Sequence, residues 1–346
     1  MIKSVLIANR GEIAIRIART ARRMGIKTYV VRTAKEPEAV YLSAADAVIN
    51  FPETDGNIPE FLDIDRLVGL AREYKIDSLH PGYGYLSENA ELAERCRDNG
   101  IVFIGPSPEV IRLMGDKVAA KGIAAQSGVP MLGASQGAVH TLDEARKIAK
   151  RLGYPVIIKA VSGGGGRGMR IVHHQDELEQ LYKIATAEAQ VAFNDPSVFI
   201  EKYLENPKHI EFQIVADNYG NVVHLGEREC SIQRKHQKLM EEAPSPALDE
   251  RLRKKMAAAA VSLAKQAGYQ SLGTVEFLLD HQKHFYFMEM NTRIQVEHPV
   301  TEEITGIDLV ELQFNIAAGR KLPLRQSQIH INGWSIECRI NAEDVQ

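Results

Sequence analysis

Two strand-like segments, residues 274–280 and 285–291, are joined by the short turn 281–284, and this spacing predicts an antiparallel hairpin. If Asp280 pairs with Phe285 at the turn, Glu276 falls directly opposite Glu289, and Asn291 joins the same face. Carboxylates at cross-strand distance repel each other unless a cation lies between them. Glutamate and asparagine oxygens suit magnesium held against phosphate groups. The hairpin therefore predicts a metal-phosphate site, for which a purely structural explanation is weak.

The segment after this hairpin is also rich in polar side chains. Continued alternation would place Arg293, Gln295 and Glu297 on the same face as Asn291. An arginine beside a metal-phosphate site can hold an anionic substrate while a nearby carboxylate removes a proton. An exposed ion pair at a strand exit is the alternative.

The N-terminal part reads as alternating strands and helices. Apolar strands are predicted at 5–8, 28–31, 76–79 and 102–104, and residues 12–24 have helical periodicity. This order predicts a doubly wound parallel sheet. The first turn, Asn9-Arg10-Gly11-Glu12, lacks the GxGxxG pattern of dinucleotide sites, so the sheet alone assigns no nucleotide.

The rest of the chain predicts a different arrangement of helices and strands. A helix at 142–152 and strands at 156–160, 169–172 and 198–200 indicate a compact α+β unit. Residues 209–214 then alternate strictly, which predicts an antiparallel sheet with one polar face. We therefore expect a mixed α/β and α+β chain in three parts, at 1–114, 115–204 and 205–346.

A glycine-rich segment, 162–168, lies between two of these predicted strands. It matches GxGxxG formally, but no helix follows it, and it lacks the ending of a P-loop. The remaining functional interpretation is a hairpin whose N–H groups close over phosphates, and a flexible surface hairpin explains it as well. Lys159, just before it, and Lys117 could each meet phosphate oxygens, although solvated lysines explain both.

Residues 227–238 form a second polar run, and a solvated charged loop explains it nearly as well as a site does. The histidine pairs 173–174 and 281/284 lack a third metal ligand, so we interpret them as exposed residues, the latter in the hairpin turn. These segments carry no functional prediction by themselves.

Composition excludes several classes of protein. The formal net charge is −3, without the broad basic surface that nucleic acid requires. The cysteines, Cys96, Cys230 and Cys338, lack CxxC spacing, which argues against a disulfide framework or zinc site. The N-terminus lacks signal-peptide features, and the apolar helical segment 256–264 is too short to span a bilayer. We expect a cytosolic protein without membrane or nucleic-acid partners.

Taken together, these motifs resemble the ATP-grasp superfamily, and within it the biotin carboxylases. The resemblance extends over the whole chain and is specific in combination. It is carried by residues 7–14, 80–84, 112–117, 162–168, 201–204 and 289–302.

The resemblance implies a role for each matching residue. Glu276, Glu289 and Asn291 would carry magnesium or manganese, while Glu297 would be the base that deprotonates bicarbonate. Arg339 would steady the ureido oxygen of biotin. Bicarbonate would be held by Lys238, Arg293, Gln295 and Val296. ATP would be contacted by Lys117, Lys159, Gly164, Gly165, Gly166, His209, Gln233, His236 and, around adenine, Glu201, Lys202, Tyr203 and Leu204.

The implied reaction has two steps, in which bicarbonate attacks the γ-phosphate of ATP and the resulting carboxyphosphate releases carbon dioxide to N1 of biotin. The implied partners are a biotin carboxyl carrier protein or domain and carboxyltransferase subunits, as in acetyl-CoA carboxylase of fatty acid biosynthesis, with a homodimer at full length. No Met-Lys carrier motif occurs, so biotin would be borne elsewhere. Biotin carboxylases also continue beyond the position of Gln346, which implies an incomplete C-terminal part.

Two alternatives stay open on the sequence. One is another bicarbonate-activating ATP-grasp ligase, such as a carbamoyl-phosphate synthetase domain. Residues 293–297 favour a biotin carboxylase over this alternative. The other is a non-catalytic nucleotide-binding regulator, against which the complete set of acidic and basic site residues speaks. The final acyl acceptor, whether acetyl-CoA, propionyl-CoA or pyruvate, is not specified.

Overall fold

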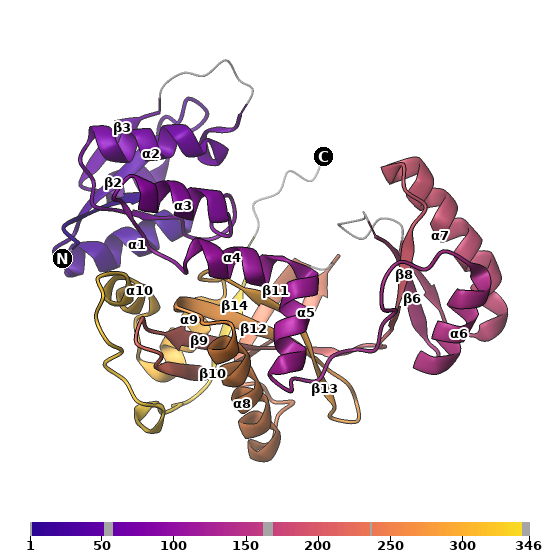
Figure 1. Ribbon diagram of the computed structural model, residues 1–346. Helices are drawn as coiled ribbons and strands as arrows, with labels where there is room; N and C mark the ends of the chain where they lie inside the picture. Colours follow the sequence, from indigo (N-terminus) through magenta and orange to yellow (C-terminus); the bar gives the residue numbers. More distant parts are fainter. Residues whose placement is uncertain (1, 52–57, 162–168, 236, 341–346) are drawn as a thin grey trace. The chain divides into compact units, whose positions relative to one another are not determined.

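The computed structural model describes residues 2–51, 58–161, 169–235 and 237–340. The chain forms two compact units, which are described separately (Figure 1). Unit 1 consists of Met1–Val129, Lys208–Leu278 and Phe287–Gln346, and unit 2 of Pro130–Pro207 and Leu279–Tyr286. Unit 1 thus joins most of the expected first and third parts of the chain.

A five-stranded parallel sheet forms the N-terminal part of unit 1, as predicted. Its strand order is β3-β2-β1-β4-β5, so the direction of winding reverses at β1. Val5 pairs with Thr28 on one side and with Ser78 on the other. The strands are β1 (Ser4–Ile7), β2 (Lys27–Arg32), β3 (Ala47–Asn50), β4 (Ser78–His80) and β5 (Val102–Phe103).

Both faces of this sheet are covered, which is why most residues of its strands are apolar. Val5 and Ile7 belong to a core that includes residues of α1 and α10, whereas Leu6 belongs to a separate core with α2 and α3. The helices of this region are α1 (Gly11–Arg23), α2 (Ile64–Glu73), α3 (Ala90–Asp98), α4 (Pro108–Gly115) and α5 (Lys117–Gln126).

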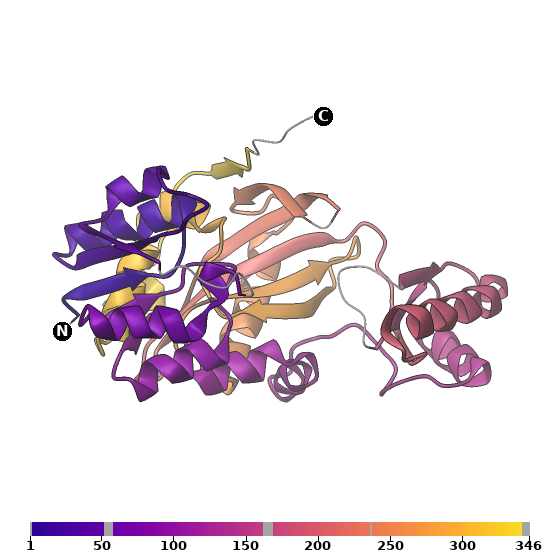
Figure 2. The same cartoon turned by 90° about the horizontal axis from the view of Figure 1, so that it is seen from above.

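The second part of unit 1 is a six-stranded sheet with the order β13-β12-β9-β10-β11-β14 (Figure 2). The β9–β10, β10–β11 and β11–β14 pairs are antiparallel, and β10 has a register shift between His224 and Glu227. The strands are β9 (Lys208–Ala216), β10 (Val222–Arg234), β11 (Gln237–Ala243), β12 (Ser271–Leu279), β13 (Phe285–Asn291) and β14 (Ser335–Cys338).

Helices lie on both faces of the six-stranded sheet. Arg253 of α8 (Glu250–Gln266) contacts Glu227 of β10, whereas Thr301 of α9 (His298–Thr305) contacts the neighbouring Arg228. Successive strand residues point to opposite faces, so α8 and α9 lie on opposite sides of β10. The last helix, α10 (Leu309–Ala317), packs against α1.

Strand β9 has the predicted alternation of side chains. The ring of Phe212 packs edge-on against Phe277, with centroids 6.2 Å apart, on the apolar face. His209, Glu211 and Gln213 share the other face and are buried as well. Buried polar groups are costly unless they are paired, so the side chains on this face must form hydrogen bonds or ion pairs with other buried groups.

The predicted hairpin between β12 and β13 is confirmed, but the predicted pairing of Asp280 with Phe285 is wrong: the turn is one residue shorter, and Asp280 bonds the backbone of Lys283 and His284. The backbone N–H of Asp280 donates to the carbonyl of His284 at 2.9 Å, and Lys283 adopts a positive φ of 66° in the turn. The Asp280 side chain also accepts hydrogen bonds from the backbone N–H groups of Gln282 and His284. A carboxylate that bonds the turn backbone favours this tight reversal.

Unit 2 contains a three-stranded antiparallel sheet with the order β7-β6-β8. Val156 and Ile158 lie on one face of β6 and form a core with apolar residues of both helices of the unit. The predicted helix and first two strands of this unit are confirmed at their predicted bounds. The elements are α6 (Leu142–Leu152), β6 (Val156–Ala160), β7 (Met169–Val172), α7 (Leu178–Phe193) and β8 (Val198–Lys202).

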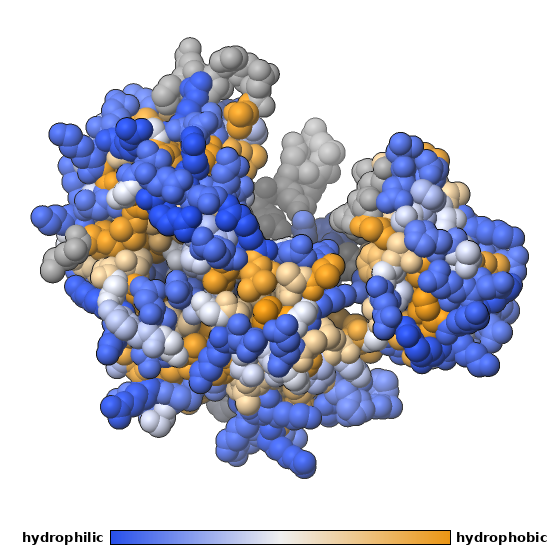
Figure 3. All heavy atoms as spheres, viewed as in Figure 1, coloured by the Kyte–Doolittle hydropathy of each residue, from blue (hydrophilic) through white to orange (hydrophobic). Residues whose placement is uncertain are grey.

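The visible surface of each unit is mostly polar, with smaller apolar areas between the charged side chains (Figure 3). Among the described residues, no helix combines the length and apolar character needed to cross a membrane.

Candidate active site

Arg228 is the centre of the buried polar face of the six-stranded sheet. Its side chain has no exposed surface, and its Nε donates a 2.5 Å hydrogen bond to the equally buried Glu211. The other hydrogen bonds of Arg228 go to neutral oxygens on β9, on β12, in the segment that leads into α9, and on α9 itself. These acceptors are Gln213 at 2.8 Å, Thr301 at 2.9 Å, Thr274 at 3.2 Å and Gln295 at 2.8 Å.

Lys238, at the start of β11, joins three carboxylates. Its Nζ lies 2.6 Å from Glu211, 2.9 Å from Glu276 and 2.6 Å from Glu297. Burial opposes the charged ammonium, but the three carboxylates outweigh burial and raise the pKa of Lys238 above its ordinary value. The lysine is therefore a fixed positive charge in the centre of the acidic residues.

Glu297 lies immediately before α9, between two cations. One carboxylate oxygen accepts from Lys238 at 2.6 Å, and the other lies 3.0 Å from a terminal nitrogen of Arg339. The side chain is only 3% exposed. A carboxylate held in this way has a fixed orientation, which a general base requires. The structure thus brings together three residues that the sequence predicted as catalytic.

His209 and Glu276 form a buried pair beside Lys238, with 2.8 Å between His209 Nε2 and a carboxylate oxygen. Burial lowers the pKa of His209, but the hydrogen bond and charge of Glu276 outweigh it, so the net shift is upward. Burial raises the pKa of Glu276, but His209 and Lys238 outweigh it, so the net shift is downward. Gln233 donates toward His209 Nδ1 at 3.3 Å, so this predicted ATP contact lies nearby.

The predicted metal ligands occupy one end of this cluster. Asn291 donates to Glu276 at 2.8 Å. Burial, followed by the charge of Glu276, raises the pKa of Glu289, whose side chain keeps an exposed surface. A carboxyl group such as Glu289, whose ionisation a neighbouring carboxylate disfavours, fits a divalent cation, since the cation would offset the repulsion between the two. The oxygen donors therefore fit magnesium or manganese.

Arg293 is held close to this end by two contacts. Its Nε donates to Glu88 at 3.0 Å, and a terminal nitrogen donates to Asn291 Oδ1 at 2.9 Å. Gln295 donates to Glu276 at 3.0 Å while its oxygen accepts from Arg228. The predicted anion-binding residues Arg293 and Gln295 thus converge on the predicted metal ligands, although Val296 has no side chain capable of hydrogen bonding.

The chain path of this segment differs from the prediction. Strand β13 ends at Asn291, and residues 292–297 form bends and a turn instead of an alternating strand. The prediction of continued alternation was therefore wrong. Convergence arises because the chain turns to enter α9 at His298, and Thr292 is fixed there by a backbone hydrogen bond to Glu88.

The alternative of a solvated loop at 227–238 is also wrong. These residues form most of β10 and the start of β11, with Arg228 fully buried. By contrast, His281 and His284 are exposed in the hairpin turn, as interpreted from the sequence. His284 lies 3.2 Å from Asp280, which explains it without a metal.

The predicted nucleotide residues fall into both units. In unit 1, Lys117 is the first residue of α5, and its charge acts on Glu289. In unit 2, Lys159 forms a 2.6 Å ion pair with Glu201, and Lys202 donates to the carbonyls of Gly153 and Tyr154. Tyr203 and Leu204 follow directly after β8. Gly164, Gly165, Gly166 and His236 lie outside the described residues.

Four residues of the cluster were not predicted from the sequence. Glu211 could have been found, because it alternates with His209 and Gln213 on β9. Arg228 was seen only as one member of a charged run. Glu241, which contacts Arg339, and Glu88, which lies in a loop of the N-terminal part, gave no sequence signal.

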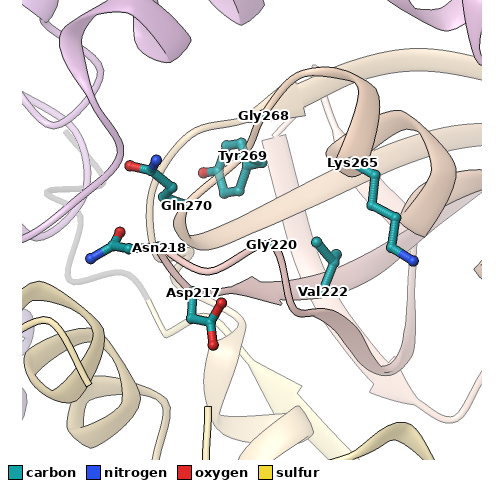
Figure 4. A pocket seen from close by; sticks show the side chains of 8 residues that line it. All are labelled: Asp217, Asn218, Gly220, Val222, Lys265, Gly268, Tyr269 and Gln270. Carbon is teal, nitrogen blue, oxygen red and sulfur yellow. The ribbon is translucent and has the colours of Figure 1, made fainter. Parts of the chain in front are cut away.

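A separate hollow lies in unit 1, with a volume of about 440 Å³ (Figure 4). Its lining includes Asp217, Lys265 and Tyr269, but none of the predicted site residues. The carboxylate of Asp217 accepts backbone N–H bonds from Tyr219, Asn221 and Leu322, so it serves a structural purpose. The chemistry-bearing residues therefore lie on the sheet face and not in this hollow.

Comparison with known proteins agrees with this geometry. Residues 1–111 match the sequence profile of the biotin carboxylase N-terminal domain. Residues 116–325 match the profile described as carbamoyl-phosphate synthase L chain, ATP binding domain. The two profiles together cover most of the chain, including the sheet face that carries Lys238 and Glu297.

Named relatives are similar over nearly the whole chain. Biotin carboxylase of Nostoc sp. is 54% identical over 340 residues, which are 98% of this chain and 76% of the relative. Biotin carboxylase 1 of Bacillus subtilis is 49% identical over 346 residues, which are 99% of this chain and 76% of the relative. The chain thus spans about three quarters of the length of these relatives.

Solved structures show the same fold. The biotin carboxylase–β,γ-ATP complex from Campylobacter jejuni matches with a TM-score of 0.90 and 48% identity, over 99% of this chain and 77% of that one. The biotin carboxylase domain dimer of Hydrogenobacter thermophilus 2-oxoglutarate carboxylase, solved with MgADP, ADP and bicarbonate, matches with a TM-score of 0.88 and 50% identity, over 99% and 76%. On its sequence, its fold and its relatives, the chain belongs to the biotin carboxylase family.

Proposed function

We propose that this protein catalyses the ATP-dependent carboxylation of carrier-bound biotin by bicarbonate, the first half-reaction of a biotin-dependent carboxylase. The observation that carries the proposal is the position of Glu297 between Lys238 and Arg339, with oxygen–nitrogen distances of 2.6 Å and 3.0 Å. A carboxylate base flanked by two cations suits an anionic acid such as bicarbonate, because the cations attract the anion that the base deprotonates.

Bicarbonate would be held by Lys238, Arg293, Gln295 and Val296. Glu297 would remove its proton, and the resulting oxygen nucleophile would attack the γ-phosphorus of ATP and release ADP. The product, carboxyphosphate, would then break down to carbon dioxide and inorganic phosphate, and N1 of biotin, after losing its proton to that phosphate, would capture the carbon dioxide. Arg339 would stabilise negative charge on the ureido oxygen of biotin during that step.

Glu276, Glu289 and Asn291 would hold the magnesium or manganese ion. The metal would neutralise phosphate charge and orient the γ-phosphate toward the nucleophile. The crowding of Glu276 and Glu289 supports this assignment, as does the MgADP named for the Hydrogenobacter relative. His209 would fix Glu276 from the opposite side through their 2.8 Å contact.

Each unit, taken by itself, contains residues that we propose as contacts of ATP. Lys117, His209 and Gln233 of unit 1 lie in or beside the charged cluster. Lys159 and residues 201–204 of unit 2 would bind phosphate and adenine, respectively. Gly164, Gly165, Gly166 and His236 complete the proposed set by their resemblance to the family.

The proposed partners are a biotin carboxyl carrier protein or domain and carboxyltransferase subunits. A homodimer in the cytoplasm, with a role in acetyl-CoA carboxylase and fatty acid biosynthesis, is part of the same proposal. A domain dimer is named for the Hydrogenobacter relative, and human pyruvate carboxylase, whose length this chain covers to 29%, is 48% identical. We also retain a three-part division at 1–114, 115–204 and 205–346 as a proposal about functional parts.

A steady-state assay of ADP formation tests this function. The protein is given MgATP with bicarbonate alone, biotin alone, both or neither. We expect slow, bicarbonate-dependent ADP formation that free biotin stimulates, because biotin consumes the activated carboxyl group. ADP formation that ignores bicarbonate, or that biotin leaves unstimulated, would exclude the proposed reaction and favour another ligase of the same fold.

A further inference from the structure

A carboxylate without an assigned role contacts the same terminal nitrogen of Arg339 as Glu297 does. Glu241 of β11 accepts from Arg339 Nε at 2.7 Å, and the same oxygen lies 2.7 Å from a terminal nitrogen of the guanidinium. The Glu241 side chain is fully buried. Arg339 follows β14 and is about one quarter exposed, so this buried contact is its fixed end.

Glu337 lies directly across from Glu241 in the β11–β14 register. Each of these two carboxyl groups has one buried oxygen for which no hydrogen-bond partner exists among the described residues. Opposed carboxylates on neighbouring strands destabilise a sheet unless a cation or proton offsets their repulsion. Here Arg339 is the nearest cation, and it contacts Glu241 but makes no described hydrogen bond to Glu337.

The charges around the pair favour protonation of one of its two carboxyls. The groups that act on Glu337 are Glu241, Glu297, Arg339 and Arg228. Burial, together with the two glutamates, raises the pKa of Glu337 to about 7, and burial raises the pKa of Glu241 as well. A proton on Glu337 leaves a single negative charge on the pair, at Glu241, which is the carboxylate that Arg339 contacts.

We infer that Glu241, supported by Glu337, is a positioning residue that holds the guanidinium of Arg339 beside Glu297. The inference rests on the proposed function, in which Arg339 meets biotin after Glu297 has acted on bicarbonate. Glu241 holds Nε and one terminal nitrogen of the guanidinium, which fixes its plane, while the second terminal nitrogen makes no hydrogen bond among the described residues and can meet a new partner. Without Glu241, Arg339 has Glu297 as its one remaining carboxylate partner among the described residues.

The inference predicts a selective kinetic defect. Glu241→Gln keeps the shape of the side chain but removes the charge that orients the arginine. We expect kcat/KM for free biotin to fall by about tenfold, the size of one charge-assisted hydrogen bond. Bicarbonate-dependent ADP formation without biotin should change by less than about twofold, because Arg339 keeps its charge and the contact between Lys238 and Glu297 is untouched.

Glu242→Gln is the matched control. Glu242 is the next residue of β11, so its side chain lies on the other face, and it pairs with Glu229 and Ile336 instead. This control should leave both rates unchanged. Equal losses of the biotin-dependent and biotin-independent rates in Glu241→Gln would show a merely structural role and overturn the inference, as would two unchanged rates.

A second measurement separates this inference from the proposed function. The Nε–H signal of Arg339, identified by its loss in Arg339→Lys, can be followed by NMR in the full chain without any substrate. We expect this proton to exchange with solvent at least about tenfold faster in Glu241→Gln than in Glu242→Gln or the unchanged protein, because a bonded N–H is protected. Equal exchange rates in all three proteins would show that Glu241 does not hold Arg339 through its Nε–H, whatever reaction the protein catalyses.

Discussion

The two units hold their proposed functional residues in opposite ways. In unit 1, Lys238 bonds three carboxylates, and Arg228 bonds five side chains, so the charged groups of the sheet face are cross-linked. In unit 2, Lys159 pairs with Glu201, and its side chain is 31% exposed. One region is a dense buried network, and the other offers a partly solvated cation.

This difference indicates how each region works. Buried charges are tolerated only when they are paired with good geometry, so the sheet face is both preorganised and sensitive to change. A half-exposed lysine costs little to rearrange and can turn toward an arriving phosphate. Substitutions in the buried network of unit 1 should therefore affect turnover and stability together, whereas substitution of Lys159 in unit 2 should affect ligand binding alone.

The largest expected effect is on turnover at the centre of the network. Glu297→Gln keeps the hydrogen-bond acceptor toward Lys238 but removes the proposed base. Bicarbonate-dependent ADP formation should fall by about 10²- to 10⁴-fold, the usual contribution of a general base. Glu303→Gln, a nearby change on α9 outside the cluster, serves as the control. Retained turnover in Glu297→Gln would show that Glu297 is not the base.

Lys238→Met should show that the network also supports the fold. Its loss leaves Glu211, Glu276 and Glu297 without their common cation, and breaking a buried ion pair costs about 3 kcal/mol. Lys208→Met is the control, since that side chain is half exposed and pairs with Glu229, so its loss should cost less than about 1 kcal/mol. Urea unfolding measures both; similar values for the two variants would refute the contrast between buried and exposed pairs.

Lys159→Met tests the other side of the comparison. We expect KM for ATP to rise by about tenfold through loss of one charge-assisted phosphate contact, with a change in unfolding free energy below about 1 kcal/mol. Lys183→Met on α7, which removes an exposed pair with Glu179, should alter neither quantity. An unchanged KM for ATP in Lys159→Met would remove this lysine from the nucleotide site.

The smallest effect concerns the pH dependence of stability. The pKa of Glu337 rises from 4.5 to about 7 on folding, so the folded state binds this proton more tightly than the unfolded state. The stability that Glu337 contributes is complete below its unfolded pKa and is lost as pH rises through about 7. Because the group keeps some solvent contact, we expect this loss to be about 1 kcal/mol.

Glu337→Gln should abolish that part of the pH dependence. The difference in unfolding free energy between Glu337→Gln and the unchanged protein, measured in urea at about pH 5 and about pH 8, should shift by about 1 kcal/mol in favour of the variant at the higher pH. A difference that stays constant with pH would show that Glu337 ionises normally in the folded protein.

The sequence predicted the elements whose pattern is local. Helix α6 and strands β6 and β7 have their predicted bounds, because apolar periodicity and flanking turn residues define them. The hairpin of β12 and β13 also followed from local spacing. Strand β3 (Ala47–Asn50) was not predicted, since its short sequence gains its identity only by pairing with β2.

The candidate site was predictable only in part, for the same reason. Glu276 and Asn291 could be placed together because they share one hairpin. Glu88 reaches Arg293 across 205 positions of sequence, and no periodicity reports such a contact. The strand expected after Asn291 does not form, because a tertiary contact, and not local alternation, sets the path of residues 292–297.

The most direct test of the central claim follows the oxygen atoms of bicarbonate. The protein turns over MgATP and biotin with bicarbonate that is uniformly labelled with ¹⁸O, and the inorganic phosphate is examined by mass spectrometry. If bicarbonate activated at Glu297 attacks the γ-phosphorus, each phosphate formed in the coupled reaction carries one labelled oxygen. Phosphate without label would show that water is the nucleophile and would contradict the assignment of the Lys238, Glu297 and Arg339 cluster to bicarbonate activation.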